Sequence, residues 1–386
     1  MGAAPGTAVA PEPGLTHNAF NFCSDPCMTT QRFSPPGQKA FAARFEAQRI
    51  AFGPVVFHCV RLAWKRGWLQ AIADSAASGL SVAEMVAQGL GTDYALRVVL
   101  ESCLSAGVVT LEADRYVLDK TGYCVLTDTM TQVHIDFVHD VCYEGLMKLD
   151  ASLTDEAPRG LSALGDWPTL YEGLSSLSEP AKTSWFAFDH LHSDTSFPAI
   201  LPDVFKTQPQ RVMDIGANTG KFARVALQHD DKAQLHLVDL PQQLAVAEQT
   251  LKDAGLMERA TLHPRNLLDL SAELPGDMDL VWLSQFLSCF SEHVIASILQ
   301  RAARALRPGG QLLILDTFWD RQRYDIAAYC LINTSPYFTA MASGNSKIYE
   351  GSVYVRHAQA AGLQLQDIRD GIGYSHSLMR FTKAQA

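Results

Sequence analysis

Short apolar runs alternate with amphipathic stretches in the second half of the chain. The runs that predict strands lie at 211–214, 234–238, 260–263, 278–283 and 311–316, and helical patterns lie at 241–254, 291–306, 325–341 and 351–361. A last pair of runs, at 363–370 and 376–381, follows without a helix between its members and predicts a hairpin. Strands that alternate with helices form a mostly parallel sheet covered by helices. The pattern therefore predicts a Rossmann-like α/β domain over residues 206–386.

Residues 39–128 show a different pattern, in which helices precede two short strands. The expected elements are a helix at 51–68, a helix capped by Ser81 and Glu84, a helix from Thr92 to Gly107, and strands at 108–112 and 115–118. Three helices and a β-wing predict a winged helix. Its third helix would read DNA, but this one has a single basic residue, Arg97, and an apolar face formed by Leu96, Val99, Leu100 and Cys103. A monomer would leave this apolar face partly exposed, so we expect a second subunit to cover it. We therefore favour a dimerisation module over a DNA-binding domain.

Two other segments complete the expected organisation. Residues 1–38 are rich in Ala, Pro, Gly and Thr and predict a tail or arm. Residues 129–205 carry helical patterns with aromatic clusters, among them the run 185–193. The sequence thus predicts a tail, a winged-helix domain, a helical connecting region and a Rossmann-like domain.

A glycine turn after the first strand of the α/β domain indicates a ligand site. Residues 214–220 read Asp-Ile-Gly-Ala-Asn-Thr-Gly, so an acid stands two positions before the first glycine. Gly216 and Gly220 let the backbone turn sharply and come close to a ligand. The spacing is not the G-x-G-x-x-G of dinucleotide sites, and Phe222 stands where a P-loop requires Ser or Thr. Asp214 would repel a phosphate but would attract an ammonium group.

The second strand of this domain also ends in an acid. Asp239 follows the run 234–238 and is placed to accept two hydrogen bonds from a ribose diol. A nucleoside joined to an amino acid, S-adenosylmethionine, suits both acids. The chain resembles the class I S-adenosylmethionine-dependent methyltransferases, whose first motif commonly reads D/E-x-G-x-G-x-G, with Asn218 here at the middle glycine. The turn 307–310, which reads Arg-Pro-Gly-Gly ahead of an apolar strand, is typical of the same class.

A winged-helix dimerisation domain before a class I sheet is the layout of small-molecule O-methyltransferases from plants and bacterial natural-product pathways. The resemblance covers residues 40–384 and implies a seven-stranded sheet, a homodimer through the N-terminal domain, and a pocket roofed by residues 129–205. It also implies a small, aromatic or phenolic substrate. The implied cofactor residues are Asp214, Gly216, Asn218, Gly220, Asp239, Leu240, Asn266, Leu267, Ser284 and Gln285, with Asn266 and Leu267 at the adenine. The implied substrate pocket contains Trp185, Phe188, Ser288, Cys289, Phe338 and Met341.

The histidine that serves as the base in the plant-type family is missing. That histidine stands in L-H-D-W-S-D, whereas residues 287–292 read Leu-Ser-Cys-Phe-Ser-Glu, with Ser288 at its position. A serine cannot act as a base near neutral pH without help. His192 and His190, in the expected roof, are the alternative catalytic residues, and their spacing of two points them to different faces of a helix.

Three outcomes follow from the missing base. The enzyme methylates oxygen with another base, it methylates a carbon or nitrogen that needs less help, or it binds the cofactor without methyl transfer. A winged-helix regulator that senses a small molecule is the alternative from another functional class. It would bind DNA, which the acidic charge and the apolar third helix disfavour.

Composition narrows the expected partners. The chain of 386 residues has a formal net charge of −10, which disfavours a nucleic-acid backbone as a main partner. No apolar run reaches the roughly 18 residues of a membrane span. The eight cysteines are scattered, and Cys23 and Cys27 have no second ligand pair beside them, so we expect no metal site. We find no signal peptide and expect a cytoplasmic protein with reduced thiols.

Overall fold

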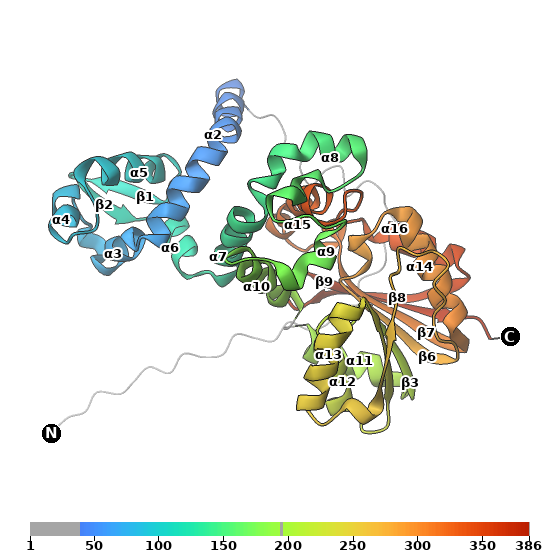
Figure 1. Cartoon of the computed structure of the whole chain (residues 1–386). Coiled ribbons are helices and arrows are strands. Elements are labelled where there is room, and N and C mark those ends of the chain that lie inside the picture. The colour runs from blue at the N-terminus through green and yellow to red at the C-terminus, as the bar shows by residue number, and fades with distance from the viewer. Residues whose placement is uncertain (1–38, 194–195, 386) are drawn as a thin grey trace, which may run out of the picture. The chain divides into compact units, whose positions relative to one another are not determined.

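The structure, a computed structural model, describes residues 39–193 and 196–385 (Figure 1). The tail expected at residues 1–38 lies outside the described residues, as does the side chain of His192. The described part contains helices and a two-stranded hairpin before residue 208, and a larger sheet with flanking helices after it.

The first part of the described chain has the order of elements that a winged helix requires. Its elements are α2 (Ala40–Lys65), α3 (Trp68–Asp74), η1 (Ala76–Ser78), α4 (Val82–Ala87), α5 (Asp93–Ser105), β1 (Val109–Glu112), β2 (Arg115–Leu118) and α6 (Lys120–Thr127). The predicted capping box is confirmed, because the Ser81 hydroxyl accepts from the Glu84 N–H and the Ser81 N–H donates to the Glu84 carboxylate at 2.9 Å. Ala113 and Asp114 both have positive φ, which suits the tight turn of the β1–β2 hairpin.

The apolar face of α5 lies inside this part of the protein. Leu96, Leu100 and Cys103 are fully buried and Val99 is 7% exposed, packed in a core with Trp68. The expectation that a single chain leaves this face exposed for a second subunit is therefore wrong. The sequence pattern predicted which residues form the apolar face of α5. It could not predict that α2, α4 and β1 pack against this helix.

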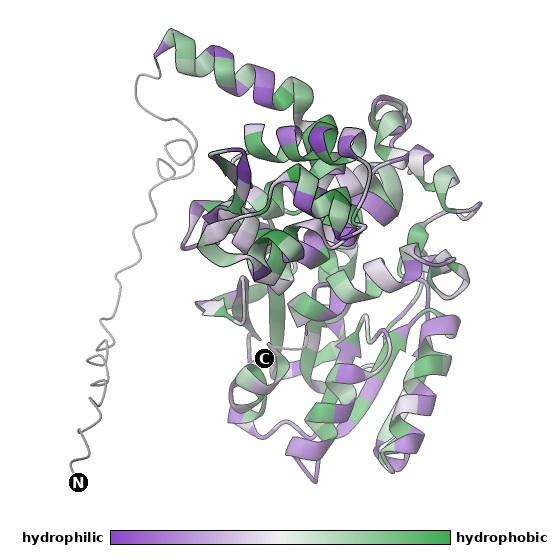
Figure 2. Ribbon diagram, turned by 90° about the vertical axis from the view of Figure 1, so that its left-hand side faces the viewer, coloured by the Kyte–Doolittle hydropathy of each residue, from purple (hydrophilic) through white to green (hydrophobic). Residues whose placement is uncertain are grey.

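Exposed apolar residues lie on α2 instead, the helix that follows the grey trace in Figure 2. Five of them recur at helical spacing on one side of the helix, namely Phe41, Phe45, Phe52, Val55 and Leu62, with exposures between 40% and 84%. We call this set the α2 stripe.

Helices of the connecting region and of the C-terminal half pack together beside the sheet. In the connecting region these are α7 (Thr129–Phe137), η2 (Val138–Cys142), η3 (Gly145–Lys148), α8 (Leu149–Asp155), η4 (Arg159–Ala163), α9 (Leu170–Gly173), η5 (Leu174–Ser176), α10 (Ala181–Ser193), α11 (Phe197–Val204) and η6 (Phe205–Thr207). The predicted helix 325–341 is α15 (Asp325–Tyr337) followed by a π-helical turn, η10 (Phe338–Ala342). Pro336 has no N–H to donate, which favours the change of helix type at this point.

The sheet within the described residues has seven strands in the order β5-β4-β3-β6-β7-β9-β8. They are β3 (Arg211–Ile215), β4 (Gln234–Asp239), β5 (Ala260–Pro264), β6 (Met278–Ser284), β7 (Leu306–Thr317), β8 (Leu363–Ile372) and β9 (His376–Lys383). All pairs are parallel except those that β9 makes with β7 and β8. The predicted strands and the terminal hairpin are confirmed. The expected turn at 307–310 belongs to β7, at a register shift opposite β6.

Helices cover both faces of this sheet. They are α12 (Lys221–His229), α13 (Pro241–Asp253), η7 (Met257–Arg259), η8 (Leu287–Cys289), α14 (Glu292–Ala305), η9 (Trp319–Arg321) and α16 (Gly351–Ala360). Val212 packs with α11, α12 and α13, and its neighbour Met213 packs with α14 and α16. Side chains of adjacent strand residues point to opposite faces, so both faces of β3 are buried.

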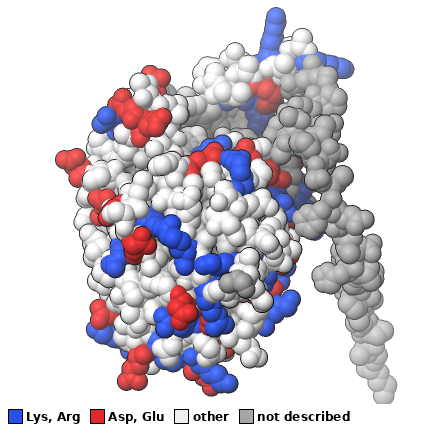
Figure 3. Space-filling model, turned by 90° about the vertical axis from the view of Figure 1, so that its right-hand side faces the viewer, with Lys and Arg blue, Asp and Glu red and all other residues white. Residues whose placement is uncertain are grey.

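Charge and thiol state complete the description. On the face in Figure 3, acidic and basic side chains are interspersed, with no continuous basic stripe. None of the helices in the described ranges is long and apolar enough to cross a membrane. The cysteines at 59, 103, 124, 142, 289 and 330 are free thiols.

Candidate functional site

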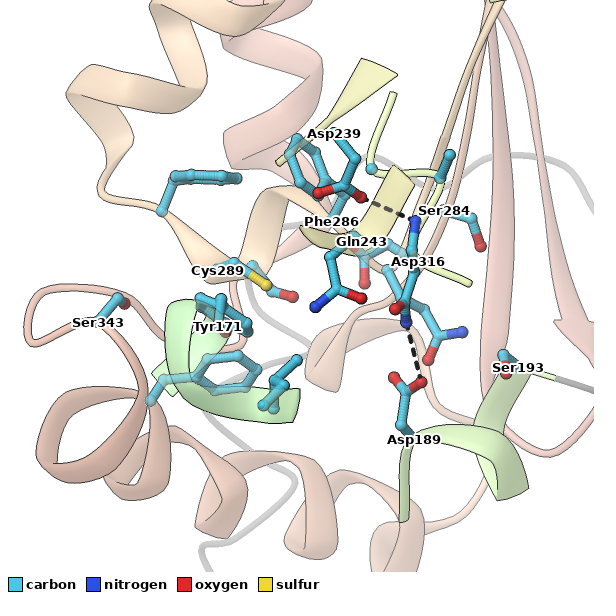
Figure 4. A pocket seen from close by; sticks show the side chains of 18 of the residues that line it. Tyr171, Asp189, Ser193, Asp239, Gln243, Ser284, Phe286, Cys289, Asp316 and Ser343 are labelled. Carbon is cyan, nitrogen blue, oxygen red and sulfur yellow. Dashed lines mark hydrogen bonds between the residues drawn. The ribbon is translucent and has the colours of Figure 1, made fainter. Parts of the chain in front are cut away.

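A cavity of about 250 Å³ opens at the carboxyl ends of β3, β4, β6 and β7 (Figure 4). The residues expected to bind the cofactor line it together: Asp214, Gly216, Asn218, Asp239, Leu240, Asn266, Leu267, Ser284 and Gln285. Gly220 is the exception. Its φ is +76°, and a Cβ on it would lie 3.0 Å from the Cβ of Ala247. Gly220 thus allows α12 to pack closely on α13.

The glycine turn has positive φ angles that most residues adopt only with strain. Gly216 has a φ of +81°, and a Cβ there would lie 2.3 Å from Cδ2 of Phe286, so a side chain is excluded. Asn218 also has positive φ, at 47°, which asparagine tolerates better than most residues. The Asn218 N–H donates to Asp239 at 2.8 Å (Figure 4). This bond ties the turn to the end of β4.

Asp214 and Asp239 are two buried acids on neighbouring strands. Burial raises the pKa of Asp214 to about 8, and the negative charge of Asp239 adds to the shift. Burial also raises the pKa of Asp239, although the N–H groups of Asn218 and Leu240 lower it in part. The Leu240 N–H donates to Asp239 at 2.6 Å. A positively charged group placed here would be strongly favoured, because it offsets both carboxylates.

The polar and charged groups that line the cavity fit S-adenosylmethionine. Among the buried oxygen atoms that have no hydrogen-bond partner within the described residues, three belong to the expected cofactor residues: Oδ2 of Asp214, Oδ1 of Asn218 and Oγ of Ser284. Buried polar atoms of this kind are expected to bind a ligand or water. The charged residues that line the cavity are mostly acids, namely Glu172, Asp189, Asp214, Asp239 and Asp316 against Lys221 and Arg265. A cofactor with a sulfonium and an ammonium suits this balance.

Arg301 fixes the loop that brings Leu267 to the cavity. This residue of α14 is 2% exposed and donates to the carbonyls of Leu267, Asp269 and Ala272 at 2.9, 3.1 and 3.0 Å. Three charge-assisted bonds to one loop hold Leu267 in place. The sequence reasoning missed Arg301, because its carbonyl partners lie about 30 positions away.

Aromatic side chains form the far end of the cavity. Trp185, Phe188, Ser288, Cys289 and Phe338 line it as expected. The Trp185 N–H donates to the Tyr337 hydroxyl at 2.8 Å, which fixes two of the rings. Tyr171 and Tyr337 line the same end and were not among the expected residues. Met341 does not line it, since it is fully buried in the helical core beside Gly145.

Of the two expected bases, His190 has a described side chain, and it does not line this cavity. His190 lies on α10 with its ring 5.7 Å from that of Phe186, and it is not among the lining residues. The side chain of His192 lies outside the described part. Two titratable groups that sequence reasoning missed do line the cavity, Asp316 and His134.

Asp316 stands at the end of β7 next to the position of the missing histidine. It is 1% exposed and accepts from the Thr317 N–H at 2.8 Å and from the Tyr354 hydroxyl at 3.1 Å. The Ser288 N–H also donates to it. Burial raises its pKa to about 7, against the lowering effect of these bonds. A carboxyl with this pKa can accept a proton near neutral pH.

Two further polar residues, His134 and Asp189, also line the cavity. Burial lowers the pKa of His134 on α7, so its imidazole is neutral at pH 7. Asp189 of α10 accepts from the Asn218 side-chain amide at 3.4 Å (Figure 4). The connecting region thus contacts the glycine turn directly, and both regions build one site.

Two protein families match the chain. The Dimerisation2-like domain matches residues 44–116, and a methyltransferase domain matches residues 213–312. The L-tyrosine C(3)-methyltransferase of Streptomyces lavendulae is 21% identical over 332 residues, which cover 85% of this chain and 89% of that protein. Aclacinomycin 10-hydroxylase RdmB of Streptomyces purpurascens is 36% identical over 108 residues, 28% of each chain.

The solved structures include a similar fold. The O-methyltransferase NcsB1 of neocarzinostatin biosynthesis, in complex with S-adenosylmethionine and 2-hydroxy-5-methyl naphthoic acid, has a TM-score of 0.61 and 19% identity. The match covers 85% of this chain and 95% of that one. This likeness shows that the two chains share a fold.

Binding of S-adenosylhomocysteine is expected to release a proton from Asp214 below about pH 8. With a pKa of about 8 the carboxyl is mostly protonated at pH 7, whereas the ligand's ammonium group favours the ionised form. Affinity should therefore rise from pH 6 to about 8. At higher pH it should fall again, because the ligand's own amino group loses its proton. Calorimetry in buffers with different ionisation enthalpies counts the released protons.

The matched control is Asp214→Asn, which keeps the size of the side chain but cannot ionise. This variant should bind more weakly and release fewer protons at pH 7. Equal proton release by both proteins, or an affinity that falls between pH 6 and 8, would contradict the role of Asp214.

Proposed function

Because this chain is a class I S-adenosylmethionine-dependent methyltransferase, we propose that it methylates a small aromatic natural-product substrate at a phenolic oxygen or an adjacent ring carbon. One observation carries this proposal. A single cavity joins the buried acids Asp214 and Asp239 to aromatic walls and to the carboxyl of Asp316. An acidic end suits the cationic cofactor, and an aromatic end suits a flat ring.

The protein's part in the reaction is to hold two molecules in line and to take up a proton. S-adenosylmethionine supplies a methyl group activated by the positive sulfur. Asp214, Asn218 and Ser284 would hold its amino-acid part, Asp239 its ribose, and Leu267 its adenine. Trp185 and Phe338 would hold the aromatic ring of the substrate. Fixing the nucleophile near the methyl group contributes several kcal/mol, roughly 7–11 in well-oriented cases.

Asp316 is the proton acceptor that the site supports best. A phenol has a pKa near 10, so about one molecule in a thousand is ionised at pH 7. Removing this proton favours methylation at oxygen and at the ring carbon beside it, since both need the phenolate. Asp316 is held by Thr317 and Tyr354, and its raised pKa matches neutral pH. It would take over the work of the histidine that Ser288 replaces.

A second candidate function is cofactor binding without methyl transfer. It is favoured by the similarity to RdmB, which is named as a hydroxylase and not as a methyltransferase. The L-tyrosine C(3)-methyltransferase, which matches far more of the chain, favours transfer to a ring carbon. Formation of S-adenosylhomocysteine during turnover separates the two functions.

We further propose that the chain forms a homodimer through the α2 stripe. Monomeric proteins rarely expose a contiguous apolar patch of this kind, so burial against a second copy is favoured. The Dimerisation2-like match covers α2 from residue 44 onward. The α5 face is already buried, whereas the stripe is exposed within the described residues and could make this contact.

Asp316→Asn should lower the rate of methyl transfer about 10²–10⁴-fold at pH 7, the usual effect of removing a positioned base. The assay follows S-adenosylhomocysteine formation and product mass with a panel of phenols that includes L-tyrosine and 2-hydroxynaphthoic acids. The wild-type rate should rise with pH through about 7 as Asp316 ionises. The variant should recover toward pH 10, where the phenol ionises unaided.

His190→Ala and His192→Ala serve as controls in the same assay and are expected to keep the wild-type pH profile. If Asp316→Asn keeps it as well, Asp316 is not the base. If a histidine variant alone loses the rate at pH 7, the base is that histidine. Absence of turnover with every phenol, together with tight S-adenosylhomocysteine binding, would favour the function without methyl transfer.

Replacing Phe45 and Phe52 together by Asp should give a folded monomer at micromolar concentration. Two charges in the middle of a buried apolar contact are costly, whereas both positions are exposed within one chain. Sedimentation velocity measures the change. The matched control, Leu100→Ala, should lower stability by about 2–5 kcal/mol and leave the dimer intact, because Leu100 is core. A wild-type monomer, or a double variant that stays dimeric, would refute the α2 contact.

A further inference from the structure

A second cavity, of about 180 Å³, adjoins the main one on the side away from the sheet strands. It lies among α7, η2, α10 and α15. The side chains that line both cavities are His134, Phe188, Cys330, Thr334 and Tyr337. The two spaces are thus separated by a single layer of side chains.

Aromatic rings make up most of this separating layer. Phe188 stacks on Phe137 with ring centroids 3.9 Å apart and planes at 12°. The ring of His134 lies 5.7 Å from that of Phe188, and Phe137 meets Tyr337 edge-on at 4.9 Å. A flat group that entered between these rings would stack on them in place of the ring–ring contacts that it breaks.

The second cavity presents an uncharged wall. No Asp, Glu, Lys or Arg is among the described residues that line it. The Asn333 amide donates to the Tyr329 carbonyl at 2.8 Å, and the Thr334 hydroxyl donates to the Cys330 carbonyl at 2.9 Å. Each of these donors is used within its own helix. Burial keeps the Cys142 thiol neutral by raising its pKa.

Irregular helical turns border this space. Val138 and Cys142 belong to the π-helical turn η2, and Tyr337 directly precedes the π-helical turn η10. The two turns pack against each other. π-Helical turns cost stability and occur frequently at functional sites. Here the wider π-helical turns form the ends of the helices beside the second cavity.

We propose that the second cavity is an apolar subsite for the hydrocarbon part of the substrate. The substrate is then a phenol with an uncharged alkyl or aryl substituent, whose hydroxyl-bearing ring lies in the main cavity. This inference rests on the proposed function, because it extends the same molecule from one cavity into the next. A carboxylate or phosphate on the substituent is disfavoured, since the subsite offers it no cation.

The test is binding of 4-alkylphenols, from phenol to 4-hexylphenol, to the full chain saturated with S-adenosylhomocysteine. Calorimetry should show affinity rising about threefold to fourfold for each methylene, as expected for full burial of the chain. Leu146→Trp fills the subsite from one side and should remove this gain without changing the affinity for phenol. Met147→Trp is the matched control, because Met147 is 84% exposed and does not line the subsite.

The outcomes separate this inference from the proposed function. If S-adenosylhomocysteine and phenol bind but affinity does not grow with chain length, the subsite is wrong and the proposed function stands. If Leu146→Trp keeps the full gain, the alkyl group lies elsewhere and the subsite is again wrong. If the cofactor product binds but no phenol does, the aromatic substrate class itself fails. A charged 4-(carboxyalkyl)phenol that binds as tightly as its neutral counterpart would overturn the assigned chemistry.

Discussion

Burial of two carboxylates side by side at the carboxyl edge of a parallel sheet is the constraint on which this structure depends. Asp214 and Asp239 end neighbouring strands, where burial raises the pKa of both. The folded protein thus binds the Asp214 proton more tightly than the unfolded chain does. This contribution to stability is present below about pH 4 and is lost as the pH rises through about 8. Apolar cores on both faces of the sheet offset the cost, and a cationic ligand would remove it.

The same edge holds a third acid for a different purpose. Asp316 lies near the end of β7, beyond β6, and lines the same cavity. Its hydrogen bonds orient the carboxyl, while burial keeps its pKa near neutrality. In the proposed function, Asp214 would match the ammonium group of the cofactor, Asp239 would bind its ribose, and Asp316 would accept the proton of the substrate. Arg301 and Asp189 then fix the loops on either side.

Much of this arrangement could be predicted from local sequence signals. Apolar runs indicate the strands, and the spacing of Asp214, Gly216 and Asp239 indicates the edge of the sheet at which the cavity opens. What could not be predicted depends on contacts between distant segments. Asp316 ends an ordinary apolar run, and its special environment arises from Tyr354, 38 positions later. The α5 face resembled an interface because the helices that bury it could not be placed. The second cavity forms only where α7, α10 and α15 meet.

The account predicts that Asp239 binds the ribose of the cofactor, and a calorimetric titration with S-adenosylhomocysteine tests this most directly. Asp239→Ala removes two charge-assisted hydrogen bonds, each of about 1.5–3 kcal/mol, and should weaken binding at least tenfold (roughly 1.4 kcal/mol). Thermal melting serves to check that the variant is folded. An unchanged affinity in a folded variant would contradict the assignment of this edge of the sheet as the cofactor site.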